Sequence, residues 1–197
     1  METPVDKQKV ATATVTKERD VRIHASLWHS SHCLLKRGQE EENASFHRFM
    51  ASLVFTAFTL EAYLNWLGGQ LFPHWSYLER LKPKEKLELI ADQLKVTIDN
   101  GKRPWQTIKP LFGFRNDIAH GKPQTLNIET VEPIDDLEKK MNEIARTDWE
   151  NFCTRENAER AREDIEHILK TVREAANLKD DLGPLSQGFQ SHTAKWL

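Results

Sequence analysis

One stretch of the sequence, residues 42–67, constrains the fold more than any other. Apolar residues recur there in steps of 4 and 3, the period of an α-helix, at Phe46, Met50, Leu53, Ala57, Leu60, Leu64 and Leu67. The apolar arc is widened beyond one seam by Phe49, Val54, Phe55 and Phe58. Such a helix needs neighbours on several sides, so we expect it at the centre of a helical bundle. We expect Gly68-Gly69 to end this helix.

The rest of the chain predicts more helices and few strands. Further helices are expected over residues 17–39, 83–99, 104–120, 134–152 and 154–178. Pro110 is expected to kink or restart its helix near Lys109. Residues 10–16 and 125–131 resemble short strands that can pair, although two isolated strands are only marginally stable. We therefore predict an all-α fold of five or six helices with a minor two-stranded β element.

The length of 197 residues suits one domain with tails. We expect an N-terminal extension over residues 1–16, a helical domain over 17–178 and a mobile C-terminal tail over 179–197. Eight glycines and eight prolines are too few for the turns of an all-β sandwich or barrel.

The cysteines and the chain start indicate a cytoplasmic setting. Cys33 and Cys153 form no paired motif, which excludes a disulfide framework within the chain and a thiolate zinc site. The first 20 residues lack the apolar segment of a secretory signal. The longest uncharged run, residues 62–78, is broken by Gly, Pro and His, so no membrane contact is expected.

The net charge of −2 excludes a globally basic nucleic-acid binder, so any such binding needs a local patch. Residues 101–123 form a candidate patch with a net charge of +4. Its one acid is Asp117, and its cations are Lys102, Arg103, Lys109, Arg115 and Lys122.

The same segment gathers side chains that suit phosphodiester cleavage. Arginine binds phosphate bidentately, and histidine exchanges protons near neutral pH. Asn116 and His120 are four residues apart and share a helix face, whereas Arg115 and His120 are separated by about 140° around an ideal helix. Arg115 and His120 converge only if the arginine wraps around or the helix loosens at Gly121. A structural alternative is an Arg115–Asp117 surface pair with His120 complementing the helix dipole.

Two segments resemble the HEPN superfamily. Arg115-Asn116-Asp117-Ile118-Ala119-His120 is similar to its Rx4-6H signature, with a polar residue after the arginine. Residues 60–67 are similar to the second helix of many HEPN proteins, where a Glu and an Asn, here Glu61 and Asn65, lie four residues apart. The resemblance implies a HEPN-like helical bundle that forms a homodimer with the two motifs facing each other.

The resemblance further implies a metal-independent endoribonuclease, a toxin or phage-defence effector with an antitoxin or defence protein as partner. The alternative that it implies is a catalytically inactive module for RNA or nucleotide binding, or for dimerisation. No cofactor or metal is expected. His24, His29, His32 and Cys33 lack the spacing and the acid of a metal site. HEPN toxins that are silenced by nucleotidyltransferases carry a Tyr where this chain has Lys122, so that form of regulation is not expected.

The resemblance also assigns roles. Arg115 would neutralise the scissile phosphate, His120 would act as general base or acid, and Asn116 would orient either group. The 2′-hydroxyl of the RNA would be the nucleophile, which leaves a 2′,3′-cyclic phosphate and a 5′-hydroxyl. Glu61, Asn65 and Asp117 would have supporting roles; Glu61 and Asn65 either buttress Arg115 or His120 or pair with another buried group. RNA would be bound by Lys109, Lys122, Arg103 and Lys102.

Overall fold

The computed structural model describes residues 13–127, 129, 141, 144–178, 183–186 and 190–196. Its helices and strands are β1 (Ala13–Arg19), α1 (Ile23–Glu40), α2 (Ser45–Leu71), α3 (Trp75–Leu78), α4 (Pro83–Leu94), the 3-10 turn η1 (Trp105–Thr107), α5 (Ile108–Ala119), α7 (Asp148–Phe152), α8 (Arg155–Ala176) and β2 (Gln190–Trp196). The all-α bundle with a minor two-stranded element is therefore confirmed. Within the described ranges, five helices exceed ten residues, and α3 and α7 are short.

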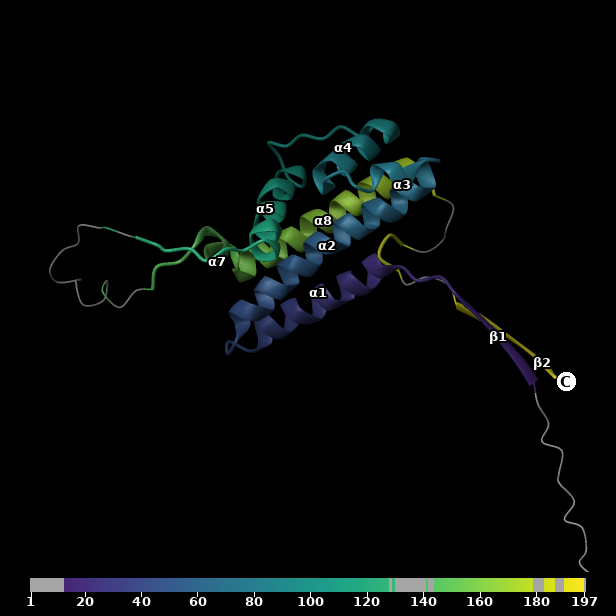
Figure 1. Cartoon of the computed structure of the whole chain (residues 1–197), viewed down its shortest axis with the longest axis horizontal. Coiled ribbons are helices and arrows are strands. Elements are labelled where there is room, and N and C mark those ends of the chain that lie inside the picture. Colours follow the sequence, from purple (N-terminus) through teal and green to yellow (C-terminus); the bar gives the residue numbers. More distant parts are fainter. Residues whose placement is uncertain are drawn as a thin grey trace, which may run out of the picture.

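Helix α2 is the central helix, as predicted. It packs against α1, α4, α5 and α8, and Figure 1 shows α1, α2 and α8 lying side by side. Its predicted seam is fully buried at Leu53, Ala57, Leu60, Leu64 and Leu67. Each buried leucine side chain stabilises the fold by roughly 1.5–3 kcal/mol, so this helix organises the core.

The predicted end of α2 at Gly68-Gly69 is wrong, because the helix continues to Leu71. Gly68 is inside the helix, and the indole ring of Trp75 lies so close that a methyl group at this position would overlap it. Gly69 has open space around its Cα. Gly68 therefore permits close packing of α3 on α2 and does not terminate the helix.

Two other helix boundaries differ from the prediction. Helix α4 ends at Leu94 rather than residue 99, because Lys95 adopts a left-handed conformation (φ 59°) and the Val96 N–H donates to Ala91 O at 2.8 Å. The helix predicted over residues 104–120 begins as the 3-10 turn η1, and α5 starts at Ile108, so the restart expected near Lys109 is confirmed. Pro110 lies in the first turn of α5, where a backbone N–H has no partner within the helix.

The helix expected over residues 134–152 is confirmed only in part. Residue 141 and α7 at its end are helical, but residues 144–147 between them are not, so α7 begins only at Asp148. Thr147 caps it, with the Glu150 N–H donating to Thr147 Oγ1 at 3.3 Å and the Thr147 N–H donating to Glu150 Oε2 at 2.7 Å. Residues 134–140, 142 and 143 of this prediction lie outside the described residues. The last predicted helix is confirmed as α8, capped by Thr154.

The two strands form an antiparallel ribbon with Thr16 opposite Thr193. Figure 1 shows the ribbon extending away from the bundle near the start of α1. A strand was predicted at residues 10–16, but β1 runs on to Arg19, so α1 begins at Ile23 rather than residue 17. The suggested partner, residues 125–131, is wrong in its described part, since Thr125, Leu126 and Asn127 are not in a strand. The partner β2 comes from the segment predicted as a mobile tail. None of the described helices is long and apolar enough to span a membrane.

Candidate functional site

Helices α2 and α5 bring Arg115 and Glu61 together. Arg115 Nη2 donates to Glu61 Oε2 in a short contact, and Arg115 Nη1 donates to Asn116 Oδ1 at 3.0 Å. The side chain of Arg115 is 16% exposed. Of the two partners that the sequence suggested for Glu61, a motif residue or another buried group, the structure therefore has the motif residue Arg115.

Aromatic rings surround the guanidinium of Arg115. Its Cζ lies 5.4 Å from the ring centre of Phe58 and 5.8 Å from that of Phe112. Cation–π attraction of this kind adds to the ion pair in fixing the guanidinium. Nε is buried without a hydrogen-bond partner among the described residues. An unpaired buried donor destabilises a fold by about 1–3 kcal/mol, so stability alone does not explain this arginine.

His120 lies at the C-terminal cap of α5. Its backbone has left the helical region (φ −121°, ψ 18°), and its N–H donates to Asn116 O at 2.9 Å. The side chains of Asn116, Asp117 and His120 are exposed. The helix thus ends at His120, next to Gly121, and among the described residues no hydrogen bond or ion pair links the side chains of Arg115 and His120. The predicted alternative of an Arg115–Asp117 pair is not formed, because Arg115 pairs with Glu61 instead.

Asn65 has a different partner from the one needed to support the motif. Its Oδ1 accepts a hydrogen bond from Lys86 Nζ at 2.8 Å, and Lys86 is only 2% exposed. Asn65 therefore joins α4 to α2 and contacts neither Arg115 nor His120. Sequence reasoning missed Lys86, although its position four residues before the buried Ile90 was a signal that it faces the core.

The four predicted RNA-binding cations fall into two pairs. Lys102 Nζ lies 3.4 Å from Asp99 Oδ2, and Arg103 donates to Asp164 at 2.8 Å and to Glu163 at 3.1 Å. The hydrogen bonds that Arg103 donates to Asp164 and Glu163 raise its pKa. Lys109 and Lys122 are exposed and have no ion pair with a described residue. Of these four cations, only Lys109 and Lys122 are therefore free of ion pairs with described residues, which is fewer than the sequence segment suggested.

Sequence reasoning also missed a buried acid that fixes the start of α5. Asp164 on α8 is 3% exposed and accepts hydrogen bonds from Arg103 Nε and, in a short contact, from Thr107 Oγ1. This network ties η1 to α8. The only local signal was that Asp164 lies on the same helix face as Ala161 and Ile168, both of which are buried.

In the described part of the chain, no three His, Cys, Asp or Glu side chains gather as metal ligands would. Comparisons with protein-family models, curated proteins and solved structures found no match. The functional interpretation therefore depends on the geometry of the site and on its chemistry.

Proposed function

We propose that the protein is a metal-independent endoribonuclease of HEPN type, acting as a toxin or phage-defence effector. The observation that carries the proposal is the guanidinium of Arg115, which is held by Glu61 and by two aromatic rings, one on α2 and one on α5. Arg115 is on α5, and this helix ends at an exposed histidine, His120. A fixed cation and a proton-exchanging imidazole are the two groups that cleavage of RNA by its own 2′-hydroxyl needs.

In the proposed reaction, an imidazole of His120 takes the proton of the 2′-hydroxyl. The 2′-oxygen attacks phosphorus, and the bond from phosphorus to the 5′-oxygen breaks as that oxygen accepts a proton from an acid. Arg115 neutralises the charge that develops on the phosphate, and Asn116 fixes one guanidinium nitrogen through its Oδ1. The products are a 2′,3′-cyclic phosphate and a 5′-hydroxyl.

The reaction needs both a base and an acid, and one chain supplies a single His120. We therefore propose a homodimer in which the second copy supplies the other imidazole. We propose that the two copies meet through the face of α2 that carries Phe55 and Phe58. These two side chains are only half-buried and do not pack against the hydrophobic core. The guanidinium of Arg115 lies over the ring of Phe58. Because the motif adjoins this face, a dimer through it would bring the two motifs into one cleft.

A second function is favoured by one observation. Each terminal nitrogen of Arg115 already donates one hydrogen bond, to Asn116 or to Glu61, and the charge of Glu61 offsets part of the attraction of Arg115 for phosphate. This arrangement supports a catalytically inactive module that binds RNA or nucleotide, or that only dimerises.

Incubation with structured and unstructured RNA in EDTA tests the proposal. We expect the wild type to cleave, and His120→Ala and Arg115→Ala each to lose at least about 100-fold in rate, the scale of general acid–base catalysis. His167→Ala, which removes an exposed histidine from α8, is the matched control and should keep its activity. Intact RNA across substrates and ionic strengths, or equal cleavage by His120→Ala, rejects the nuclease. RNA binding without cleavage in all proteins supports the inactive module.

A further inference from the structure

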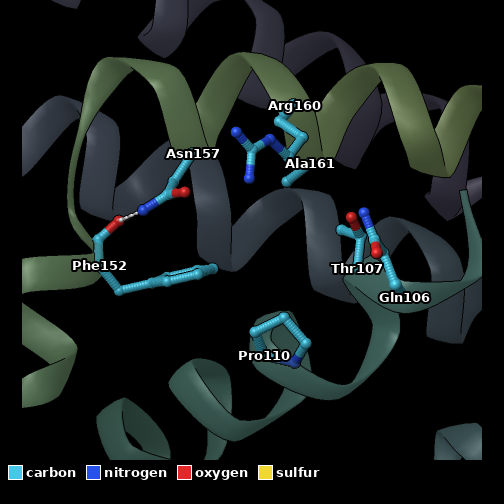
Figure 2. Close-up of a pocket in the computed structure, with 7 residues that line it drawn as sticks. All are labelled: Gln106, Thr107, Pro110, Phe152, Asn157, Arg160 and Ala161. Atoms are coloured by element: carbon cyan, nitrogen blue, oxygen red, sulfur yellow. Dashed lines mark hydrogen bonds between the residues drawn. The ribbon is translucent and has the colours of Figure 1, made fainter. Parts of the chain in front are cut away.

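A pocket of about 320 Å³ lies between the start of α5, the end of α7 and the first turns of α8. Figure 2 shows its lining residues, which are Gln106, Thr107, Pro110, Phe152, Asn157, Arg160 and Ala161. Sites for small organic ligands usually begin near about 300 Å³, so this volume suits one small molecule or one unit of a polymer.

The pocket has an apolar surface and a polar edge. The ring of Phe152 extends into it, Arg160 lies on α8 beyond Asn157, and Gln106 and Thr107 lie across the pocket from Phe152 (Figure 2). Asn157 Nδ2 donates to Phe152 O at 3.1 Å, which fixes the carboxamide and leaves Oδ1 as an acceptor for a ligand. The side chain of Gln106 supplies a second carboxamide. A flat ring with hydrogen-bonding edges fits this arrangement, because aromatic side chains stack on bases and carboxamides bind base edges.

Arg160 supplies a positive charge that its neighbours do not cancel. Two acids near it on α8 are engaged elsewhere: Glu159 binds Arg155 at 2.7 Å and Gln39 at 2.6 Å, and Glu163 binds Arg103 at 3.1 Å. A third acid, Glu156, lies one turn before Arg160 but forms no ion pair with it. Arg160 itself forms no ion pair with a described residue. A guanidinium without an ion-pair partner can bind a phosphate group through two hydrogen bonds.

The walls of the pocket are fixed before any ligand binds. The hydrogen bond from Thr107 to Asp164 connects one wall to α8. The rings of Phe152 and Phe114 contact each other with centroids 5.2 Å apart, which connects α7 to α5. Preorganised walls lower the cost of ordering on binding.

We infer that this pocket binds a nucleotide, with the base on Phe152, its edge at Asn157 and Gln106, and its phosphate on Arg160. The site is distinct from the motif, because Pro110 and His120 are ten residues apart on α5, about 15 Å along the axis. It goes beyond the proposed function, since it assigns nucleotide binding to a second site with its own lining residues, and binding there does not require cleavage. The nucleotide can be a free molecule or one unpaired residue of an RNA strand.

Calorimetric titration of the full chain tests the inference with two probes, the four ribonucleoside 5′-monophosphates and a 2′-O-methyl RNA octamer, which has no free 2′-hydroxyl and resists cleavage. We expect Arg160→Gln to weaken binding at least tenfold and Phe152→Leu several-fold. Lys170→Gln removes one positive charge from the same helix, ten residues from Arg160 and outside the pocket, so it should stay within twofold of the wild type.

The probes distinguish the source of the nucleotide. Monophosphate binding that depends on Arg160 indicates a free nucleotide, and octamer binding alone with the same dependence indicates an RNA strand. Absence of binding by both probes, or equal weakening by Lys170→Gln and Arg160→Gln, overturns the inference. Failure of the nuclease proposal would instead leave RNA uncleaved in EDTA with nucleotide binding intact.

Discussion

His24 is a buried histidine whose surroundings favour its neutral form. It is 1% exposed, and its ring lies 5.2 Å from that of Tyr63. Burial, and then the charge of Arg22, lower the pKa of His24 to about 4. The unfolded chain therefore binds a proton at His24 more readily than the folded chain does, so this group makes stability depend on pH.

We predict that acidification destabilises the fold through His24. Above the ordinary pKa of 6.5 both states are neutral at this residue, and between 6.5 and about 4 only the unfolded state takes up the proton. The free energy of unfolding should fall across this window by up to about 3 kcal/mol. Urea denaturation at several pH values measures it. His24→Gln should flatten the curve, whereas the exposed His167→Gln should not; an unchanged curve in His24→Gln would contradict the prediction.

Adjacent glycines in α2 provide a second test. We predict that Gly68→Ala destabilises the protein by about 1–3 kcal/mol, because the new methyl group overlaps Trp75 and forces α3 away. Gly69→Ala should instead stabilise it by about 0.5–1 kcal/mol, since that position is open and alanine favours a helix. Chemical denaturation of both variants checks this, and equal effects at the two positions would refute the packing explanation.

At the scale of elements, the link between α2 and α5 is the Glu61–Arg115 ion pair. Both side chains are largely shielded, with Arg115 16% and Glu61 26% exposed. Removal of one partner from a shielded pair leaves the other charge without compensation, which costs more than the loss of a surface pair.

We predict that Glu61→Gln lowers stability by about 1–2 kcal/mol and RNA cleavage at least tenfold, because the guanidinium loses its fixed orientation. Glu88→Gln breaks an exposed pair with Lys84, 3.6 Å apart, and should cost less than about 0.5 kcal/mol without affecting cleavage. Denaturation and single-turnover rates measure the two effects. Cleavage by Glu61→Gln at the wild-type rate would show that Glu61 does not position Arg115.

The sequence predicted those elements whose signals are local. The helical period of α2 and the Thr154 cap of α8 lie within each helix, so both helices were predicted within a few residues. The partners of Arg103 could not be predicted in the same way, since Asp164 lies 61 residues further along the chain. The Glu61–Arg115 pair spans 54 residues. It was suggested only as one alternative, because the two segments that contain these residues resemble parts of one family.

At the scale of the whole molecule, β1 and β2 join two ends of the described chain. Strand β2 was missed because a strand partner at the opposite end of a chain leaves no local periodicity, and Gly and Pro residues before it predicted a mobile tail. The proposed homodimer is also a property of the whole molecule, and it depends on the face of α2 that carries Phe55 and Phe58.

We predict that Phe55→Glu converts a dimer into a monomer while helical content is retained, because the substitution places a charge on a half-buried side chain that does not pack against the core. Light scattering after size-exclusion chromatography measures the mass, and circular dichroism the helicity. Tyr77→Glu changes another exposed aromatic residue, 69% exposed on α3, and should remain dimeric. A wild-type monomer, or a dimeric Phe55→Glu, would exclude this interface.

The most direct test of the central claim uses one RNA oligonucleotide whose cleavage site has been mapped. Replacing the ribonucleotide on the 5′ side of that bond with its 2′-deoxy form removes the proposed nucleophile. We expect cleavage at this bond to disappear, while the unmodified RNA yields a 2′,3′-cyclic phosphate with the wild type and remains intact with His120→Ala. Cleavage of the deoxy bond, or the same products from His120→Ala, would contradict the account.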